Sequence, residues 1–328
     1  MYPPKYDGNI HPDEWINDYL SYMNFKGGGF SINLQYAISL VDPIIKLPTG
    51  IDDFEKLRKA LKEDISFTVF KNTNKRKLQL LTYIPERDGG ETSNFISKFR
   101  KLCYNAEIND IEEQKEYINQ SILNDYFITE FFKRKQKIDS INELIKEFEE
   151  IVMYETSLIR NGSIVRLKHV ATGKYLGSIN NLCYTTGSKS QLVFASNYDS
   201  NALWKITFTS GKELASYTDT NIYLQHKSSS NFLGIYYGYY KSPVTQHTEV
   251  NCYSQNQWKF NHNKLENYQG YLKSNDTINL SINNFKYQQV FLRSHDLKFA
   301  IGNDTFQEVV CHNERLGGND EWCIELIK

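Results

Sequence analysis

Two histidines recur in the second half of the chain, at places where paired imidazoles could bind a metal or move a proton. His169 and His226 each end a Val/Ile-x-Leu-x-His pattern. A third copy of the pattern carries Ser294 at that place, with His295 beside it, so the set that a repeated metal site needs is incomplete. We interpret each histidine as a hydrogen-bonding partner of a turn in its own repeat, with a chemical role as the alternative.

Other residue types that support catalysis or metal binding occur without a known pattern. Cys311, His312 and Cys323 form a metal-like group, but their spacing fits no common zinc site, and small buried hydrophobes explain the cysteines. The sequence has no phosphate-binding loop, nucleophile elbow or His-Glu-x-x-His motif. We therefore predict a protein that is not an enzyme, with no catalytic residue, metal or cofactor. An enzyme with an unrecognised site is the alternative.

The strongest candidates for ligand binding are the tyrosines of one Tyr-Tyr-Gly-Tyr-Tyr segment, namely Tyr236, Tyr237, Tyr239 and Tyr240. Exposed tyrosine rings stack on sugars and on protein surfaces. A β-hairpin that packs on its neighbour explains the same segment, so both interpretations stay open.

These residues belong to a region that repeats itself three times. Each copy has a Val/Ile-x-Leu strand, an aromatic-rich segment with a glycine, an apolar strand and a strand that begins with tryptophan. The Val/Ile-x-Leu strand is at 165–169 in the first copy, 222–226 in the second and 290–294 in the third. The segment with the glycine follows at 175–177, 232–234 and 299–302. The apolar strand is at 191–193, 248–250 and 307–309, and the strand that begins with tryptophan is at 204–206, 258–260 and 322–324. One copy has too small an apolar face to bury alone, so the three must share one core.

The first copy carries a more specific signature. Thr172-Gly173, within the segment 167–176, resembles the first-repeat signature of MIR domains, which occur in protein O-mannosyltransferases, inositol trisphosphate receptors and ryanodine receptors. The resemblance covers about residues 162–328 and implies a β-trefoil. It also implies binding and positioning of a partner rather than catalysis.

The repeated tryptophans Trp204, Trp258 and Trp322 are interpreted as core residues rather than ligand platforms. Sugar-binding trefoils often carry a Gln-x-Trp motif. Ala202, Asn256 and Asp320 hold the glutamine position here, which weakens a lectin interpretation of that type.

The first half has a different composition, with helical spacing of apolar residues and six of the seven prolines at or before Pro85. Ser140 and Glu143 have the form of a capping box and begin a clear 3.6-residue apolar stripe. The segment 85–90 lacks apolar side chains apart from its proline, and we predict a hinge there between two helical lobes. The basic segment 71–77 is interpreted as a solvated helix face, with a phosphate-binding patch as the alternative.

The order of these helical features resembles the Gag capsid domains of gypsy-type retrotransposons. The resemblance rests on a Pro-Pro-x-Tyr-Asp-Gly opening followed by Trp15, on a Phe-x-x-Leu-x-x-Ala-Leu helix at 54–61, and on the segment 91–102. It covers about residues 3–153 and implies a retrotransposon-derived, two-lobed capsid-like domain. No zinc knuckle or protease signature follows, so the resemblance implies self-assembly or peptide binding rather than RNA packaging.

Composition narrows the function classes. The chain has 328 residues, a formal net charge of -1 and no apolar run long enough to span a membrane, so we expect neither a membrane nor nucleic acid as its partner. Five scattered cysteines and the lack of a secretory signal predict a cytoplasmic protein with reduced thiols.

Together these patterns predict a multidomain α and β chain. An all-α, two-lobed capsid-like domain at 1–155, with lobes at about 1–86 and 87–155, precedes an all-β trefoil at 162–328. We expect a non-enzymatic interaction or scaffold protein. Its helical half would self-associate or bind a peptide, and its trefoil would bind a protein or glycan partner. The alternative is a carbohydrate-binding, lectin-like module.

Overall fold

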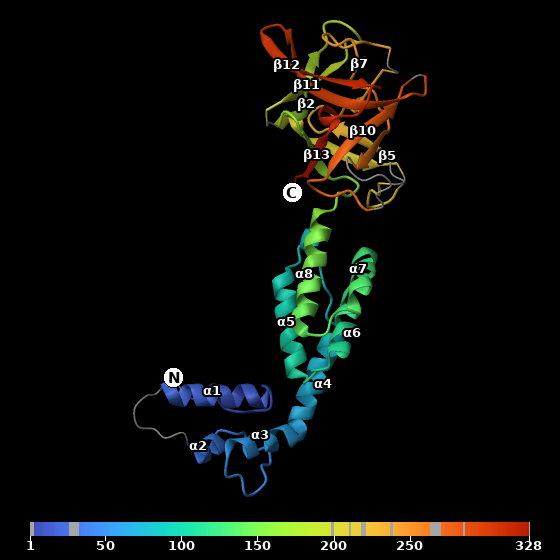
Figure 1. Cartoon of the computed structure of the whole chain (residues 1–328). Helices are drawn as coiled ribbons and strands as arrows, with labels where there is room; N and C mark the ends of the chain where they lie inside the picture. The colour runs from blue at the N-terminus through green and yellow to red at the C-terminus, as the bar shows by residue number, and fades with distance from the viewer. Residues whose placement is uncertain are drawn as a thin grey trace. The chain divides into compact units, whose positions relative to one another are not determined.

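The computed structural model describes residues 3–25, 33–197, 200–209, 211–217, 221–236, 239–262, 270–284 and 286–327. It separates into two compact units, Met1–Thr156 and Ser157–Lys328. Helices make up the first unit and strands dominate the second, which confirms the predicted fold class (Figure 1). Within the described ranges, no helix has the length and apolar character needed to cross a membrane.

The helical unit is built from short amphipathic helices. In chain order these are α1 (Pro12–Phe25), α2 (Leu34–Ser39), α3 (Phe54–Glu63), α4 (Ile65–Gln79), η1 (Glu86–Asp88), α5 (Thr92–Asn105), α6 (Ile111–Ser121), α7 (Asp125–Lys135) and α8 (Ile141–Ser157). Side-chain caps begin several of them: Asp53 accepts a hydrogen bond from the Lys56 amide at α3, and Ser140 accepts one from the Glu143 amide at α8.

Two apolar clusters fill the helical unit, and they divide inside α4. The first runs from Tyr6 to Leu61 and the second from Leu78 to Val152. The predicted hinge at 85–90 therefore lies beside the second cluster and does not separate the two. It is a tight turn, because the Gly90 amide donates to the Pro85 carbonyl at 3.1 Å. A side chain at Gly90 would collide with the Ile84 carbonyl, so close backbone approach accounts for the glycine at this position.

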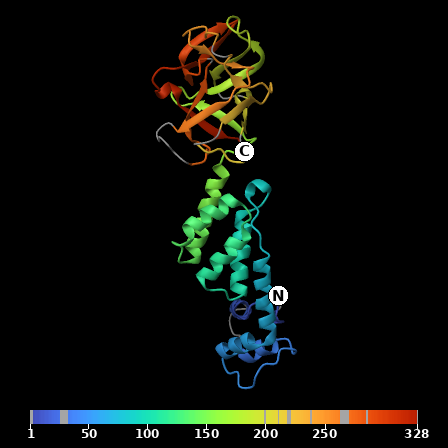
Figure 2. The ribbon, with the colours of Figure 1, turned by 90° about the vertical axis from the view of Figure 1, so that its right-hand side faces the viewer.

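Antiparallel strands form the second unit (Figures 1 and 2). They are β1 (Ile164–His169), β2 (Tyr175–Cys183), β3 (Gln191–Ser196), β4 (Trp204–Phe208), β5 (Asn221–His226), β6 (Leu233–Gly234), β7 (Thr248–Glu249), β8 (Asn251–Cys252), β9 (Trp258–His262), β10 (Thr277–Asn283), β11 (Gln289–Ile301), β12 (Asp304–His312) and β13 (Trp322–Leu326). Short 3-10 turns, η2 (Ser200–Ala202) and η3 (Gly318–Asp320), precede β4 and β13. One apolar core takes residues from all three repeats.

Three tryptophans define the threefold repetition. Trp204, Trp258 and Trp322 are fully buried. Their indole nitrogens donate to the carbonyl oxygens of Leu176, Leu233 and Leu292 at 2.9, 2.8 and 3.1 Å. The same bond at the same place in each copy confirms that the tryptophans are core residues, and it makes the three leucines equivalent.

This equivalence corrects the predicted alignment of the third copy. Leu292 corresponds to Leu176 in β2 and not to Leu167 in β1. The strand that matches β1 is β10, where Ile278 pairs with Trp322 as Val165 pairs with Trp204. The sequence pattern alone could not distinguish β11 from β10, because neighbouring strands that face the same core have the same alternation of apolar residues. The segment 299–302 lies in the extended hairpin of β11 and β12, while the apolar and tryptophan strands align as predicted.

Candidate functional site on the trefoil

The repeated histidines connect one repeat to another. His169 Nδ1 lies 2.8 Å from Thr172 Oγ1 in its own turn, and its Nε2 donates to the Asn319 carbonyl at 3.0 Å. His226 makes the matching bonds to Ser229 and to the Asn201 carbonyl. Burial lowers the pKa of His169, which favours the neutral ring that this pattern needs. The predicted structural role in a turn is confirmed for both histidines.

The third repeat places a charged cluster where the second repeat has a glycine and an asparagine. Arg293 follows Leu292 as Gly234 follows Leu233, and Asp320 stands two residues before its tryptophan as Asn256 does. In the second repeat the Asn256 amide oxygen lies 2.3 Å from the position that a Cβ on Gly234 would take. Arginine at this position therefore needs a different partner, and Asp320 supplies it.

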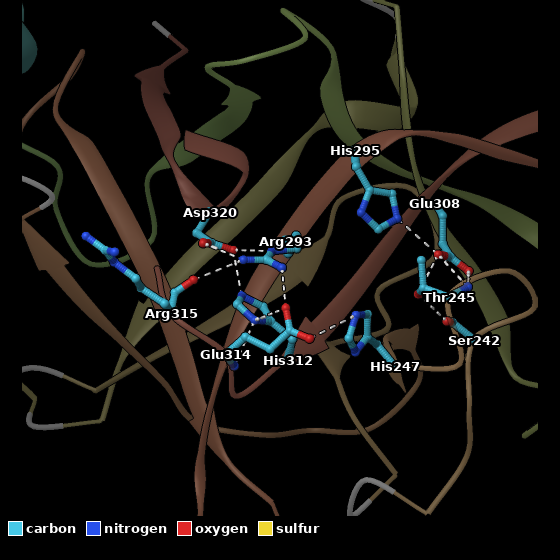
Figure 3. A network of polar contacts seen from close by, with 10 residues as sticks. All are labelled: Ser242, Thr245, His247, Arg293, His295, Glu308, His312, Glu314, Arg315 and Asp320. Atoms are coloured by element: carbon cyan, nitrogen blue, oxygen red, sulfur yellow. Dashed lines mark hydrogen bonds and ion pairs between the residues drawn. The ribbon is translucent and has the colours of Figure 1, made fainter. Parts of the chain in front are cut away.

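Arg293 and His312 hold Asp320 as a buried anion (Figure 3). The arginine Nε and Nη2 donate to the two carboxylate oxygens at 2.8 and 3.1 Å, and His312 Nε2 lies 2.7 Å from Oδ1. Burial raises the pKa of Asp320, but the hydrogen bonds from His312 and Arg293 outweigh it and lower the pKa to about 2. Exposed Glu314 also pairs with Arg293 at 3.0 Å.

A second buried carboxylate, Glu308, holds the loop 242–246 (Figure 3). It accepts hydrogen bonds from the Val244 amide at 2.8 Å and the Thr245 hydroxyl at 2.8 Å, and His295 Nε2 lies 3.1 Å away. Burial raises the pKa of Glu308, yet these donors together lower it to about 2. Both anions therefore stay ionised at neutral pH, where their hydrogen bonds hold the neighbouring loops.

A pocket lies where the hairpins of the three repeats meet. It encloses about 460 Å³ and takes residues from every repeat. The lining residues are Tyr184, Thr185, Thr186, Gly187, Lys241, Ser242, Pro243, Gln246, Phe299, Ala300 and Ile301. Beneath it, Tyr184 belongs to a small apolar cluster with Leu192, Phe194 and Phe306, and its hydroxyl donates to the Val250 carbonyl at 2.8 Å. The pocket offers hydroxyls, an amide, an ammonium group and two large apolar side chains.

Three of the four predicted tyrosines, Tyr236, Tyr239 and Tyr240, precede the lining residue Lys241 in the chain. Tyr240 immediately precedes Lys241, and its ring centroid lies 5.5 Å from that of Tyr236. Tyr239 is 59% exposed. Tyr237 lies outside the described residues. The sequence identified this segment by composition, but it gave no signal for the pocket itself, because residues from three distant hairpins form it.

The structure places the members of the metal-like group on two strands, with Cys311 and His312 on β12 and Cys323 on β13. Cys311 and His312 are neighbours on β12, so their side chains leave opposite faces of the strand. His312 is committed to Asp320. Among the residues that the structure describes, no group of three or more histidine, cysteine or acidic side chains is placed to hold a metal ion.

Comparison with known proteins adds likenesses in fold. The sequence matches no model of a known protein family and no curated protein. An SDF2-like protein from Arabidopsis thaliana is 24% identical over 51% of this chain and 94% of its own, with a TM-score of 0.44. The protein O-mannosyltransferase Pmt1-Pmt2 complex of S. cerevisiae, solved with its sugar donor, is 15% identical over 79% of this chain and 40% of that chain, with a TM-score of 0.43.

A ricin B-like lectin from Macrolepiota procera, solved with lactose, is 14% identical over 51% of this chain and 97% of its own, with a TM-score of 0.32. Since all these TM-scores are low, the trefoil assignment rests on the threefold tryptophan bonds of the chain itself. The chain therefore contains a helical unit followed by a β-trefoil.

We expect Asp320→Asn to destabilise the trefoil by about 3 kcal/mol, because it removes the buried anion of Arg293 and His312 and leaves the partly buried arginine with only exposed Glu314 as its counter-ion. The double change Arg293→Gly with Asp320→Asn reproduces the Gly234–Asn256 pair of the second repeat, so it should cost less than the single change. Urea unfolding of the full chain, followed by near-ultraviolet circular dichroism, measures both. A double variant less stable than Asp320→Asn would contradict the equivalence of the repeats.

Acid should selectively weaken the trefoil. The pKa values of Asp320 and Glu308 are about 2 in the folded state and lie below those of exposed carboxyls. Their stabilising contribution is therefore present above the unfolded-state pKa values and is lost as the pH falls toward 2. We expect the free energy of unfolding to fall from roughly pH 5 downward, and to fall less steeply in an Asp320→Asn, Glu308→Gln variant. Equal slopes would contradict this assignment.

Proposed function

We propose that the protein is a non-enzymatic interaction protein whose trefoil binds a ligand at the pocket where its three hairpins meet. The observation that carries this proposal is a pocket lined by all three repeats, one of whose lining residues, Lys241, directly follows the exposed Tyr239 and Tyr240 in the chain. A fixed core with a mixed polar and apolar pocket suits recognition, because the binding groups are held in place before the ligand arrives.

A glycan is the ligand class that these groups fit best. Tyrosine rings present apolar faces on which the C–H face of a sugar stacks, and their hydroxyls form hydrogen bonds at the edge. Thr185, Thr186 and Gln246 supply further groups that pair with sugar hydroxyls. A peptide would use the same rings and the apolar side chains Phe299 and Ile301, and it is the alternative outcome of the test.

Catalysis is not part of this proposal. The two carboxylates with the strongest pKa shifts, Asp320 and Glu308, each accept several hydrogen bonds from neighbouring side chains and amides. A general acid or base needs a pKa near the working pH, and these two lie far below it. Their geometry supports a scaffold that holds loops around a binding pocket.

The helical unit is proposed to contact other protein chains. Its resemblance to Gag capsid domains implies self-association or peptide binding. Several of its large apolar side chains are exposed, among them Leu123 and Phe132.

The glycan proposal predicts that the exposed rings of Tyr239 and Tyr240 carry affinity. We expect Tyr239→Ala and Tyr240→Ala each to weaken binding about tenfold, because each removes a stacking face. The full-length chain is first screened on a glycan array, and the affinity of any bound glycan is then measured by calorimetry. Tyr287→Ala is the matched control, since Tyr287 is 89% exposed and lies outside the segment.

Two results would contradict the proposal. Glycan binding that survives both tyrosine changes would place the site elsewhere. Binding of peptides but of no glycan, with the same sensitivity to Tyr239→Ala, would keep the pocket and change the ligand class.

A further inference from the structure

A large groove runs along the surface of the helical unit between α5 and α8. It has a volume of about 920 Å³, opens widely to solvent and is lined by one face of each helix. The residues are Ser93, Ile96, Ser97, Arg100, Lys101 and Tyr104 on α5 and Asn142, Ile145, Lys146, Glu149 and Glu150 on α8. Their spacing of three, four, seven and eight residues is that of a single helix face. The groove therefore has the shape that accepts a third helix.

Helices α5 and α8 run in opposite directions along this groove. Phe95, in the first turn of α5, packs on Phe148 in α8 at 5.3 Å between ring centroids. Arg87, which precedes α5, pairs with Glu155 near the end of α8 at 2.8 Å. The start of α5 therefore lies beside the end of α8, and Figure 1 shows the two helices side by side.

This arrangement gives the groove opposite charges at its two ends. Arg100 and Lys101 lie toward the start of α8, and Glu149 and Glu150 lie toward the start of α5, with Lys146 between them. Lys101 already pairs with Glu14, and Glu150 pairs with Arg134 and Lys146. Arg100 and Glu149 are exposed and form no ion pair with any residue that the structure describes.

The matching helix is present in the same chain. Helix α7 has Asp125 in its first turn and Lys133 near its end, and Phe132 on its outer face is 72% exposed. Leu123, just before the helix, is 76% exposed. Asp125 and Lys133 are roughly 12 Å apart along the axis of α7, and Arg100 and Glu149 are roughly 9 Å apart along the groove. Long side chains can span this difference of a few ångströms. Figure 1 shows α7 and α5 on opposite sides of α8.

We propose that α7 of a second copy of this chain docks in the α5–α8 groove. Phe132 of one copy fills the apolar part of the groove beside Ile96 and Ile145 of the other. Asp125 faces Arg100, and Lys133 exchanges its partner Glu130 for Glu149 of the other copy. This orientation places the helix antiparallel to α5. The docking proposal rests on the proposed role of the helical unit in contacting proteins, and it is independent of the trefoil ligand.

The groove and α7 are different surfaces, so the contact is heterologous. Each copy then offers a free groove at one end and a free α7 at the other, and association continues beyond a dimer unless a ring closes. This property separates the proposal from a symmetric dimer, in which both copies use the same patch.

A mixing experiment with the full-length chain tests the proposal. We expect the mass of the native chain to rise with concentration up to about 100 μM in sedimentation equilibrium, the affinity range of a weak contact. Phe132→Asp removes the docking side chain and keeps the groove. Arg100→Glu with Glu149→Lys reverses the groove charges and keeps α7. Each variant alone should be monomeric, whereas their mixture should form a one-to-one heterodimer.

Charge exchange and a matched control complete the design. Adding Asp125→Lys and Lys133→Glu to the groove variant should restore association, because both partners are then reversed. Ile44→Asp changes an apolar residue that is 84% exposed and lies outside both surfaces, so it should leave association unchanged. Circular dichroism checks that every variant is folded.

The proposal is overturned by a native chain that stays monomeric, by association that survives Phe132→Asp, or by a mixture that stays monomeric. The same samples are assayed for trefoil ligand binding. A monomer that still binds its ligand would reject this contact and leave the proposed function of the trefoil intact.

Discussion

The bond from each tryptophan indole to a leucine carbonyl is the constraint on which the trefoil depends. A buried indole N–H without an acceptor is costly, and so is a buried carbonyl without a donor. Each of the three bonds satisfies both groups, and each joins the last strand of a repeat to its second strand. The ring and the leucine also belong to the shared core, so the same pair fixes register and packing together.

The hairpins outside this shared core differ between the repeats, as the third repeat shows. Its Arg293 and Asp320 replace the glycine and asparagine of the second repeat. Its two carboxylates, Asp320 and Glu308, accept hydrogen bonds that hold the neighbouring loops. The first repeat has an apolar residue, Leu192, where the other two have Glu249 and Glu308. A pocket where the three hairpins meet is therefore asymmetric although the frame is threefold, and one asymmetric ligand can fit it.

Sequence patterns predicted the two-part fold and the three tryptophan strands, because a large apolar ring in a short alternating strand is most stable inside a core. They failed where two structures share one pattern. The Val-x-Leu alternation of β11 looks like that of β1, and only pairing with Trp322 distinguishes them. A run of polar residues and glycines at 85–90 likewise suits both a hinge and a tight turn. The Arg293–Asp320 pair and the pocket depend on residues distant in sequence, so spacing carried no signal for either.

The most direct test of this account compares Trp204→Phe, Trp258→Phe and Trp322→Phe. Each change removes one buried indole donor and its hydrogen bond to a leucine carbonyl, at a cost of about 2 kcal/mol. Because the three positions are equivalent, urea unfolding of the full chain should give closely similar losses for all three. A variant as stable as the native chain would contradict the claim that all three bonds hold the trefoil together.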